Sequence, residues 1–402
     1  MRLNCSSLRP EVRFNCRQAA DFARVAPQIE ALIDIKQQEV KAVKQVQLEP
    51  KNGVLMVMYP KLLPSVYSTV RLLRTYNCSL PVELWYLDSE MGTNPLNESK
   101  ILQSLVNEYG PISLRGIAKG SADGFNTKVF ALAHSELDQV LFLDADNSPV
   151  KDPTYLFTTP EFVNTGAIFW PDFWHPANTI FNINKDSLLW ELVGMKYTDM
   201  FEQESGQLLI DRRRSEVALE IVQFLALRKP DHFERLKLLH GDKDLFRLAW
   251  LKTNTSFHMI QTPAAAAGTV KGKLFCGMTM VQHDPQGNML FLHHNGKKLI
   301  GDGETNTARV WTHLQSFVFP ENLTLVNANA AERYEYLSTN YHVRIFGGGM
   351  IRGISMCYGD NKMKSMHYTT TSWDDLPYKQ LEDQLHDFTQ EAAALEKASG
   401  TQ

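Results

Sequence analysis

The sequence predicts an α/β protein with a mostly parallel central sheet flanked by helices, and three observations support this prediction. Short apolar runs of strand length recur along the chain. Longer segments with apolar residues at helical spacing separate these runs, as in βαβ units. The apolar run 140–143 ends directly at two carboxylates, Asp144 and Asp146. Ligands of such sheets bind at the carboxyl ends of strands, so we expect the functional site there.

Each element of the predicted sheet has its own pattern. Short apolar runs bounded by polar or turn residues are typical of buried strands. They cover residues 54–59, 82–87, 112–117, 140–143 and 164–170. The helices show apolar residues every three or four positions. They cover residues 62–73, 101–109 and about 126–137.

The pattern is less regular in the second half of the chain. Residues 186–250 are predicted to be mostly helical, with polar loops at 204–207 and 241–244 that lead into helices. The Ala/Gly-rich segment 262–272 predicts a loop. We expect short strands and loops over residues 341–370.

A strand through residues 291–294 contains two adjacent histidines. Successive side chains of a strand point to opposite faces, so only one of His293 and His294 can face a given site. A lone histidine beside apolar residues is more often structural than a ligand. After this strand, residues 376–397 predict a surface helix.

Length and composition indicate an ordinary globular protein. The 402 residues suffice for two domains or for one large domain with extensions. We expect a helical N-terminal extension over residues 1–48, a main domain over 49–320 and a C-terminal extension over 321–402. A net charge of -4 and 21% charged residues exclude a strongly basic protein, so no nucleic-acid partner is expected.

Cysteines and apolar segments restrict the class of protein further. The five cysteines are dispersed and form no Cys-x-x-Cys pair, so neither a zinc site nor a dense disulfide framework is indicated. No run approaches the roughly 18 apolar residues of a transmembrane helix. Five Asn-x-Ser/Thr sequons allow glycosylation in a secretory compartment. They lie at Asn4, Asn77, Asn97, Asn254 and Asn322.

The carboxylates at the end of the run 140–143 have two interpretations. Asp144 and Asp146 can share Mg²⁺ or Mn²⁺, which usually takes further ligands from substrate phosphates. They can equally cap backbone groups where a strand turns into a loop. Asp172 offers a similar choice, because it lies between aromatic residues. It either holds sugar hydroxyls or caps a turn beside core aromatics.

Several motifs in a fixed order resemble one family. The motifs are Leu143-Asp-Ala-Asp-Asn147, Gly166-Ala-Ile-Phe-Trp-Pro-Asp172, Glu204-Ser-Gly-Gln207, Gly241-Asp-Lys-Asp244, Gln282-His-Asp-Pro285 and His293-His-Asn295. Together they resemble the fungal-type Golgi α-mannosyltransferases, glycosyltransferase family 71. The resemblance implies that residues 49–320 form a GT-A domain, a Rossmann-like nucleotide-sugar fold. It also implies a location in the Golgi lumen, reached through a membrane anchor that is absent from this sequence.

The resemblance implies a metal-dependent site for a nucleotide sugar, with Mn²⁺ or Mg²⁺ and GDP-mannose as the donor. Asp144, Asp146 and His293 match the positions of the metal ligands. We expect Asp146 to bind the metal directly. For Asp144, direct ligation, ligation through water and contact with the donor ribose all stay open.

Other motif residues receive roles from the same resemblance. Lys128 matches a basic position near the donor, and either Lys297 or Lys298 is expected over the diphosphate. Glu204 and Gln207 are expected near the reacting sugar. Asn164 and Asp172 are expected to hold donor or acceptor hydroxyls.

These assignments predict a retaining α-mannosyltransferase that acts on a glycan or glycoprotein acceptor. A divalent ion and a lysine stabilise the charge that develops on the departing diphosphate. Retention needs no strong protein base, because the departing phosphate can take the acceptor proton. The alternatives are the same fold with UDP-galactose or UDP-glucose, a haloacid-type phosphatase, and a non-catalytic glycan-binding protein.

Overall fold

Within the residues that the computed structural model describes (14–42, 49–301, 309–347 and 356–399), seven strands form one sheet in the order β3-β2-β1-β4-β7-β6-β8. Their bounds are β1 (Asn52–Val57), β2 (Val82–Leu87), β3 (Ile112–Ile117), β4 (Gln139–Leu143), β6 (Ala167–Pro171), β7 (Gln203–Asp211) and β8 (His258–Met259). The first four run parallel, and β7 is antiparallel to both of its neighbours. The predicted mostly parallel sheet is confirmed.

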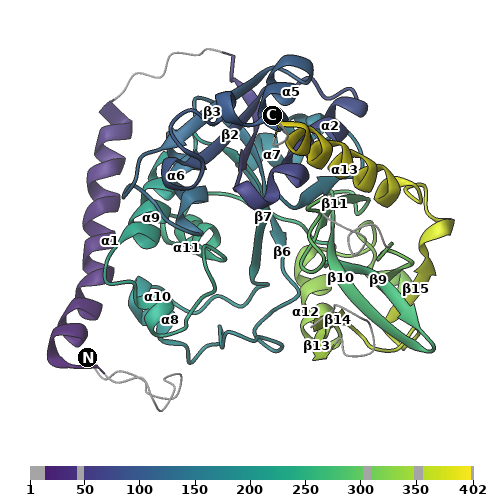
Figure 1. Ribbon diagram of the computed structural model, residues 1–402. Helices are drawn as coiled ribbons and strands as arrows, with labels where there is room; N and C mark the ends of the chain where they lie inside the picture. The colour runs from purple at the N-terminus through teal and green to yellow at the C-terminus, as the bar shows by residue number, and fades with distance from the viewer. Residues whose placement is uncertain (1–13, 43–48, 302–308, 348–355, 400–402) are drawn as a thin grey trace.

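Helices cover both faces of this sheet, as predicted (Figure 1). Leu55 and Val57 of β1 face one apolar core, whereas Val54 and Met56 face the other. The first core is covered by α1 (Cys16–Ala42), α6 (Asn126–His134), α8 (Leu188–Val193), α9 (Glu216–Leu227) and α11 (Leu245–Lys252). The second is covered by α2 (Leu63–Thr75), α5 (Lys100–Glu108) and α7 (Pro160–Thr165). This arrangement agrees with the GT-A fold that the resemblance implied.

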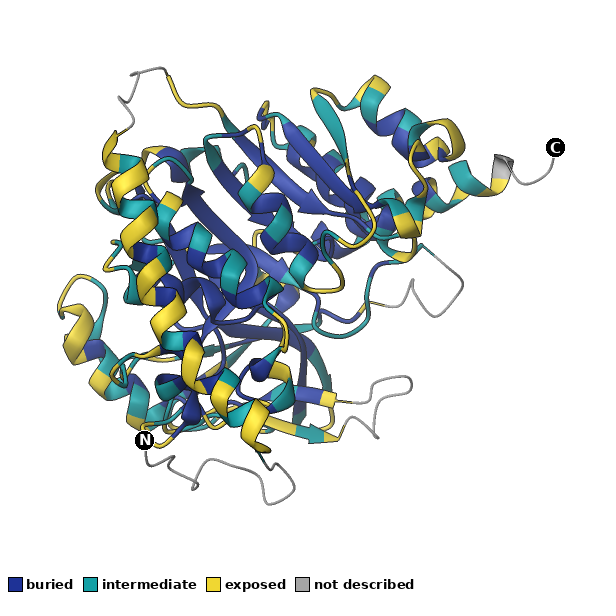
Figure 2. Cartoon of the chain, turned by 90° about the vertical axis from the view of Figure 1, so that its left-hand side faces the viewer, coloured by how far each residue is buried: buried dark blue, intermediate teal, exposed yellow. Residues whose placement is uncertain are grey.

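The remaining helices are short, apart from α12 and α13. They are α3 (Asp88–Met91), α4 (Pro95–Glu98), α10 (His232–Arg235), α12 (Ala330–Asn340) and α13 (Leu381–Ser399). Figure 2 shows the buried strands enclosed by helices whose outer faces are exposed. Among the described residues, no helix combines the length and apolar character needed to span a membrane.

A second, antiparallel sheet lies beside the first and was not predicted. Its strands are β5 (Asn147–Pro149), β9 (Ala265–Lys271), β10 (Leu274–His283), β11 (Met289–His293), β12 (His313–Phe317), β13 (Arg344–Gly347), β14 (Met356–Gly359) and β15 (Tyr368–Ser372). The strand β5 directly follows the turn that contains Asp144 and Asp146, and it pairs with β11. The two sheets therefore meet at this turn. Strands from both sides of residue 320 enter the second sheet, and the three-part division of the chain stays a prediction.

Two loop predictions are wrong. Residues 262–272 contain β9, which pairs along β10 and β12. Gly268 lies so close to β10 that a Cβ would meet the Cys276 carbonyl oxygen at 1.9 Å. The missing side chain therefore permits close pairing of the two strands, and this glycine does not indicate a loop. Residues 204–207 lie in β7, which is buried along its whole length. Their polarity resembles a loop locally, but Glu204 and Ser205 line the functional site and Gln207 bonds to the turn after β4. The segment 241–244 does lead into a helix, α11, as predicted.

The predicted surface helix near the C-terminus is present as α13, but one side of it is buried. It lies across α2 (Figure 1). Leu385 and Ala392 are buried, and the Tyr67 hydroxyl of α2 donates to Glu391 Oε1 at 3.0 Å. The Arg71 guanidinium of α2 lies 4.1 Å from the centre of the Phe388 ring. The helix is therefore part of the packed structure.

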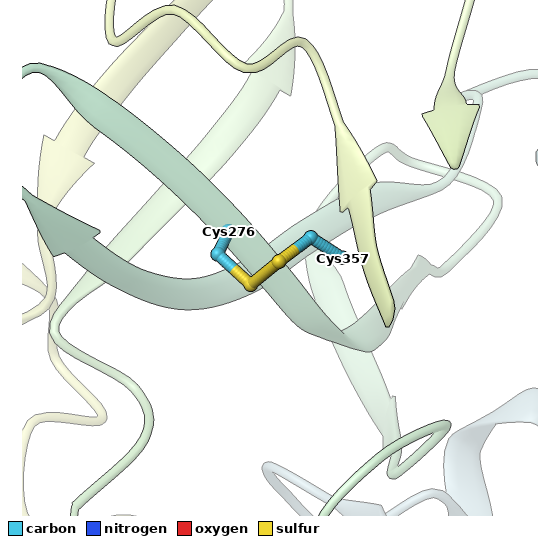
Figure 3. Close-up of a disulfide and its surroundings, with 2 residues drawn as sticks. All are labelled: Cys276 and Cys357. Carbon is cyan, nitrogen blue, oxygen red and sulfur yellow. A yellow bond between two sulfur atoms is a disulfide. The ribbon is translucent and has the colours of Figure 1, made fainter. Parts of the chain in front are cut away.

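One disulfide joins Cys276 of β10 to Cys357 of β14 (Figure 3). These strands are neighbours in the second sheet, where Gly277 pairs with Tyr358. Among the described cysteines, Cys16 is exposed and reduced, and Cys78 is buried and reduced. The sequence alone did not indicate this pairing.

Candidate functional site

The turn after β4 positions the two central carboxylates. The Asp144 backbone N–H donates to the Gly206 carbonyl of β7 at 2.9 Å. The Asn147 N–H donates back to the Asp144 carbonyl at 3.0 Å and closes the turn. The His294 N–H donates to the Asp146 carbonyl at 3.0 Å, which ties the turn to the end of β11. Backbone bonds from two other strands therefore fix where both carboxylates lie.

The pairing of β5 with β11 brings His293 to these carboxylates, opposite Asn147. The His293 Nε2 atom lies 3.3 Å from Asp146 Oδ1 and 3.9 Å from Asp144 Oδ2. Ligand atoms of all three side chains lie within 4.8 Å of one another. The next residue, His294, is buried on the opposite side, with its ring 5.0 Å from the Trp311 ring. The prediction that only one of the two histidines faces the site is confirmed.

The chemistry of this group fits a divalent metal ion. Two carboxylates and one imidazole form an oxygen-and-nitrogen ligand set that suits Mn²⁺ and also accepts Mg²⁺. The Asp146 side chain is only 8% exposed and the His293 side chain 12%, so these two ligand side chains are largely shielded from water. Burial raises the pKa of Asp144, although Lys128 and His293 oppose that shift. A bound cation would relieve the cost of these buried charges.

Glu204 orients the His293 ring from behind. Its Oε1 atom lies 3.4 Å from His293 Nδ1 and accepts a hydrogen bond from the Gly206 N–H at 2.6 Å. Burial opposes the charge on both Glu204 and His293, but the attraction between the two charges outweighs the effect of burial. The pKa of Glu204 is lowered to about 2, and the pKa of His293 is raised. With a proton on Nδ1 facing Glu204, Nε2 is directed toward the two aspartates, as in metal-binding histidines.

Lys128, on α6, holds Asp144 in place. Its Nζ lies 3.2 Å from Asp144 Oδ1 and 2.9 Å from Asp242 Oδ2, and it donates to the Ser205 carbonyl at 2.7 Å. Burial opposes its charge, but Asp144 and Asp242 together raise the pKa of Lys128. The lysine therefore stays charged and acts on the site through Asp144.

The two candidate lysines of the segment after β11 differ in position. The Lys298 ammonium contacts the Asp146 carboxylate, and Lys298 lines the cavity. Burial lowers the pKa of Lys298, although Asp144 opposes that shift. Lys297 does not line the cavity among the described residues. The structure therefore brings Lys298, and not Lys297, to the metal group.

A cavity of about 420 Å³ opens above the metal group. Its wall combines charged groups with aromatic rings. The lining includes Tyr59, Phe125, Ser205, His240, Asp242, Lys243, Asn295 and Tyr358. It is large enough for part of a nucleotide sugar.

Three further candidate residues lie outside the lining of this cavity. Asp172 is buried at the end of β6, where its Oδ2 lies 2.6 Å from the Nζ of Lys243. Burial raises the pKa of Asp172 to about 7, against the effect of Lys243. Gln207 is fully buried, and its Oε1 accepts a 2.6 Å hydrogen bond from Asn147 Nδ2, so it supports the turn. Asn164 is exposed on α7, at the opposite end of β6 from Asp172.

Asp242 and Lys243 were not among the candidate residues from sequence. Asp242 pairs with Lys128, and Lys243 links Asp172 to Glu202, whose Oε2 lies 3.0 Å from the lysine Nζ. Their motif, Gly241-Asp-Lys-Asp244, contributes to the family resemblance, but it was otherwise interpreted as a polar loop before a helix. The available signal in the sequence was the run of three charged residues, Asp242, Lys243 and Asp244, directly after Gly241.

Comparison with known proteins gives a family match that covers all seven strands of the first sheet. The family model described as "Mannosyltransferase putative" matches residues 51–284. The α-1,2-mannosyltransferase MNN21 of Candida albicans is 24% identical over 81% of this chain and 58% of its own length. The α-1,2-mannosyltransferase MNN2 of Saccharomyces cerevisiae is 24% identical over 58% of this chain and 45% of its own length. The chain thus spans about half the length of these curated relatives.

Similarity to solved structures is weaker. The bifunctional glycosyltransferase WbbM is 14% identical, with a TM-score of 0.35 over 54% of this chain and 40% of that chain. A TM-score this low carries no weight for fold or function.

Proposed function

The chain belongs to the mannosyltransferase family whose model matches residues 51–284, and we propose that it is a metal-dependent, retaining α-mannosyltransferase. The proposed reaction moves mannose from GDP-mannose to a glycan or glycoprotein acceptor. The observation that carries this proposal is the group of Asp144, Asp146 and His293 at the floor of a cavity. The printed names of the relatives favour mannose as the transferred sugar.

In this proposal, Asp144, Asp146 and His293 hold Mn²⁺ or Mg²⁺. When bound, the ion would stabilise the negative charge that develops on the departing diphosphate. Lys298, next to Asp146, supplies a second positive charge at the same place. Lys128 acts as a positioning residue, because Asp242 and the Ser205 carbonyl hold its ammonium against Asp144.

The contacts of Glu204 give it a supporting role in the proposed retaining mechanism. Burial opposes its charge, but His293 outweighs this effect and the pKa of Glu204 is lowered to about 2, so Glu204 is a carboxylate at neutral pH. Its Oε1 is already engaged by His293 and the Gly206 N–H. We assign Glu204 two roles. It orients the His293 ring, and it stabilises positive charge near the reacting sugar. The acceptor proton then passes to the departing phosphate, and no strong protein base is needed.

The haloacid-type phosphatase fits this topology poorly. That class carries its Asp-x-Asp motif after the first strand of its sheet. Here Asp144 and Asp146 follow β4, which lies between β1 and β7 in the middle of the sheet.

We further propose that the protein works in the Golgi lumen. The Cys276–Cys357 disulfide supports this location, because disulfides persist in oxidising compartments. Four of the five sequon asparagines lie among the described residues and are exposed, and Asn4 lies outside them. The four are Asn77, Asn97, Asn254 and Asn322.

A donor screen with the purified chain tests the proposed reaction. We expect Mn²⁺-dependent release of GDP from GDP-mannose and transfer to methyl α-mannoside with an α linkage, measured by NMR. Asp146→Asn should reduce turnover by about 100-fold or more and weaken Mn²⁺ binding, measured by electron paramagnetic resonance. Asp375→Asn is the matched control, because Asp375 is exposed and remote from the cavity lining.

Three outcomes would contradict the proposal. Turnover of UDP-galactose or UDP-glucose with none of GDP-mannose would reject the donor. Full activity after metal removal by EDTA would reject the metal site. Wild-type inactivity with every donor and acceptor would favour a non-catalytic glycan-binding protein.

A further inference from the structure

Two aromatic rings, Phe125 and His240, line the cavity mouth, and a third, Phe181, packs behind His240. Phe125, at the start of α6, is 60% exposed although it is a large apolar residue. The His240 ring lies 5.8 Å from the Phe125 ring, and the Phe181 ring stacks on His240 at 5.6 Å with an interplanar angle of 8°. We call these three residues the aromatic wall. Exposed aromatic faces of this kind are typical of binding surfaces.

The aromatic wall is held in place by its neighbours. A Cβ at Gly241 would lie 2.9 Å from two atoms of the Phe125 ring, so the ring rests directly on this glycine. The Nζ of Lys243 lies 4.8 Å from the centre of the Phe181 ring, and its ion pair with Asp172 fixes it there. The wall is therefore preorganised, which lowers the cost of ordering it on binding.

The nucleotide of a donor belongs elsewhere in the cavity. In an open α/β sheet, nucleotides bind between two neighbouring strands whose following connections run in opposite directions along the sheet. In the order β2-β1-β4, this point lies between the ends of β1 and β4. Tyr59 and Leu62 follow β1 and line the cavity there. The aromatic wall instead borders Asp242 and Lys243, on the segment that leads into α11.

We infer that the aromatic wall, with Phe125 as its exposed face, is the subsite for a sugar ring of the acceptor glycan. This inference rests on the proposed function and adds the position of the acceptor. A pyranose ring has an apolar face of C–H groups that packs on an aromatic ring, while its hydroxyls point outward. The exposed His240 ring supplies a hydrogen-bonding group beside that face, while Asp242 next to it is buried and paired with Lys128. A base-stacking role for Phe125 is the competing outcome of the test.

Binding measurements test this subsite independently of turnover. Mannotriose is titrated into the protein in the presence of Mn²⁺ and GDP, and binding is followed by calorimetry and ligand-observed NMR. We expect Phe125→Ala to weaken mannotriose binding by about ten-fold and to leave GDP affinity unchanged. Phe125→Trp should retain binding, because it keeps an aromatic face. Val326→Ala is the control, since Val326 is 92% exposed and outside the cavity lining.

The outcomes separate this inference from the proposed function. Weaker GDP binding with unchanged mannotriose binding in Phe125→Ala would overturn the inference in favour of base stacking. Failure of the wild type to bind mannotriose would also overturn it. If the wild type binds mannotriose through Phe125 but turns over no donor, the subsite stands and the proposed transfer reaction fails.

Discussion

Gly206 allows His293 to lie against β7. A Cβ at this position would lie 2.6 Å from His293 Nδ1 and 3.0 Å from Glu204 Oε1. The distance to His293 Nδ1 is shorter than real Cβ contacts and the distance to Glu204 Oε1 is tighter than most, so any larger residue would displace the imidazole. Glycine is therefore required at this position because a side chain from β11 approaches the backbone closely. The backbone does not turn here.

We therefore expect Gly206→Ala to weaken Mn²⁺ binding by about ten-fold or more, because the ring can no longer aim Nε2 at the aspartates. Electron paramagnetic resonance of bound Mn²⁺ measures this change. Gly296→Ala is the matched control, since the nearest atom to its Cβ would lie at 3.8 Å. Unchanged Mn²⁺ affinity in a folded Gly206→Ala protein would exclude His293 as a ligand.

Residues of the site differ in how far sequence could reveal them. Asp144 and Asp146 follow a strand directly, so a local pattern predicts them. His293 emerged from the resemblance, since its local pattern favoured a structural role. The roles of Asp242 and Lys243 are visible only from their ion pairs with Lys128 and Asp172, which lie far away in the chain.

At the scale of elements, α1 is attached to the sheet domain by both apolar and charged contacts. Its buried residues Phe22, Val25, Ile29 and Ile33 recur every three or four positions, which is why the helix was predictable. Asp21 pairs with Arg228 at 2.8 Å and with His232 at 2.7 Å. The hydrogen bond from Arg228 is the main reason that the pKa of Asp21 falls to about 2.

This shift makes part of the stability depend on pH. The folded pKa of Asp21 is below its unfolded value of 3.8, so its contribution is complete above about pH 4 and is lost as pH falls toward 2. We expect Asp21→Asn to lower the free energy of unfolding by about 1 to 2 kcal/mol at pH 7. At pH 3 the difference should be about half as large.

Urea unfolding at pH 7 and pH 3 measures both values. Asp34→Asn is the matched control, because Asp34 is an exposed carboxylate on the same helix. A difference between Asp21→Asn and the wild type that does not shrink at pH 3 would contradict the assigned ion pair.

At the scale of the whole molecule, two sheets share one site. The first sheet supplies Asp144 and Asp146 at the end of β4 and Glu204 on β7, while the second supplies His293 on β11. The disulfide lies within the second sheet and joins residues 81 positions apart. It constrains the part of the chain that carries β11 to β14.

We expect the double variant Cys276→Ser/Cys357→Ser to lose about 2 to 4 kcal/mol of stability. The reason is that the unfolded chain without the disulfide has more conformational entropy. Urea unfolding of the oxidised wild type and the variant measures this loss. The single variant Cys78→Ser is a control for loss of a buried thiol without a disulfide. Equal unfolding midpoints for the double variant and the wild type would show that the bond contributes nothing.

The sequence by itself determined the strands β1 to β4, the helices between them and the position of the two aspartates. These features depend on periodicity within a few residues, which the chain displays locally. Only the tertiary structure decided that residues 204–207 form a buried strand, that β9 belongs to a second sheet, and that Cys276 pairs with Cys357. The physical reason is that polar or small residues resemble loops until distant segments supply their partners.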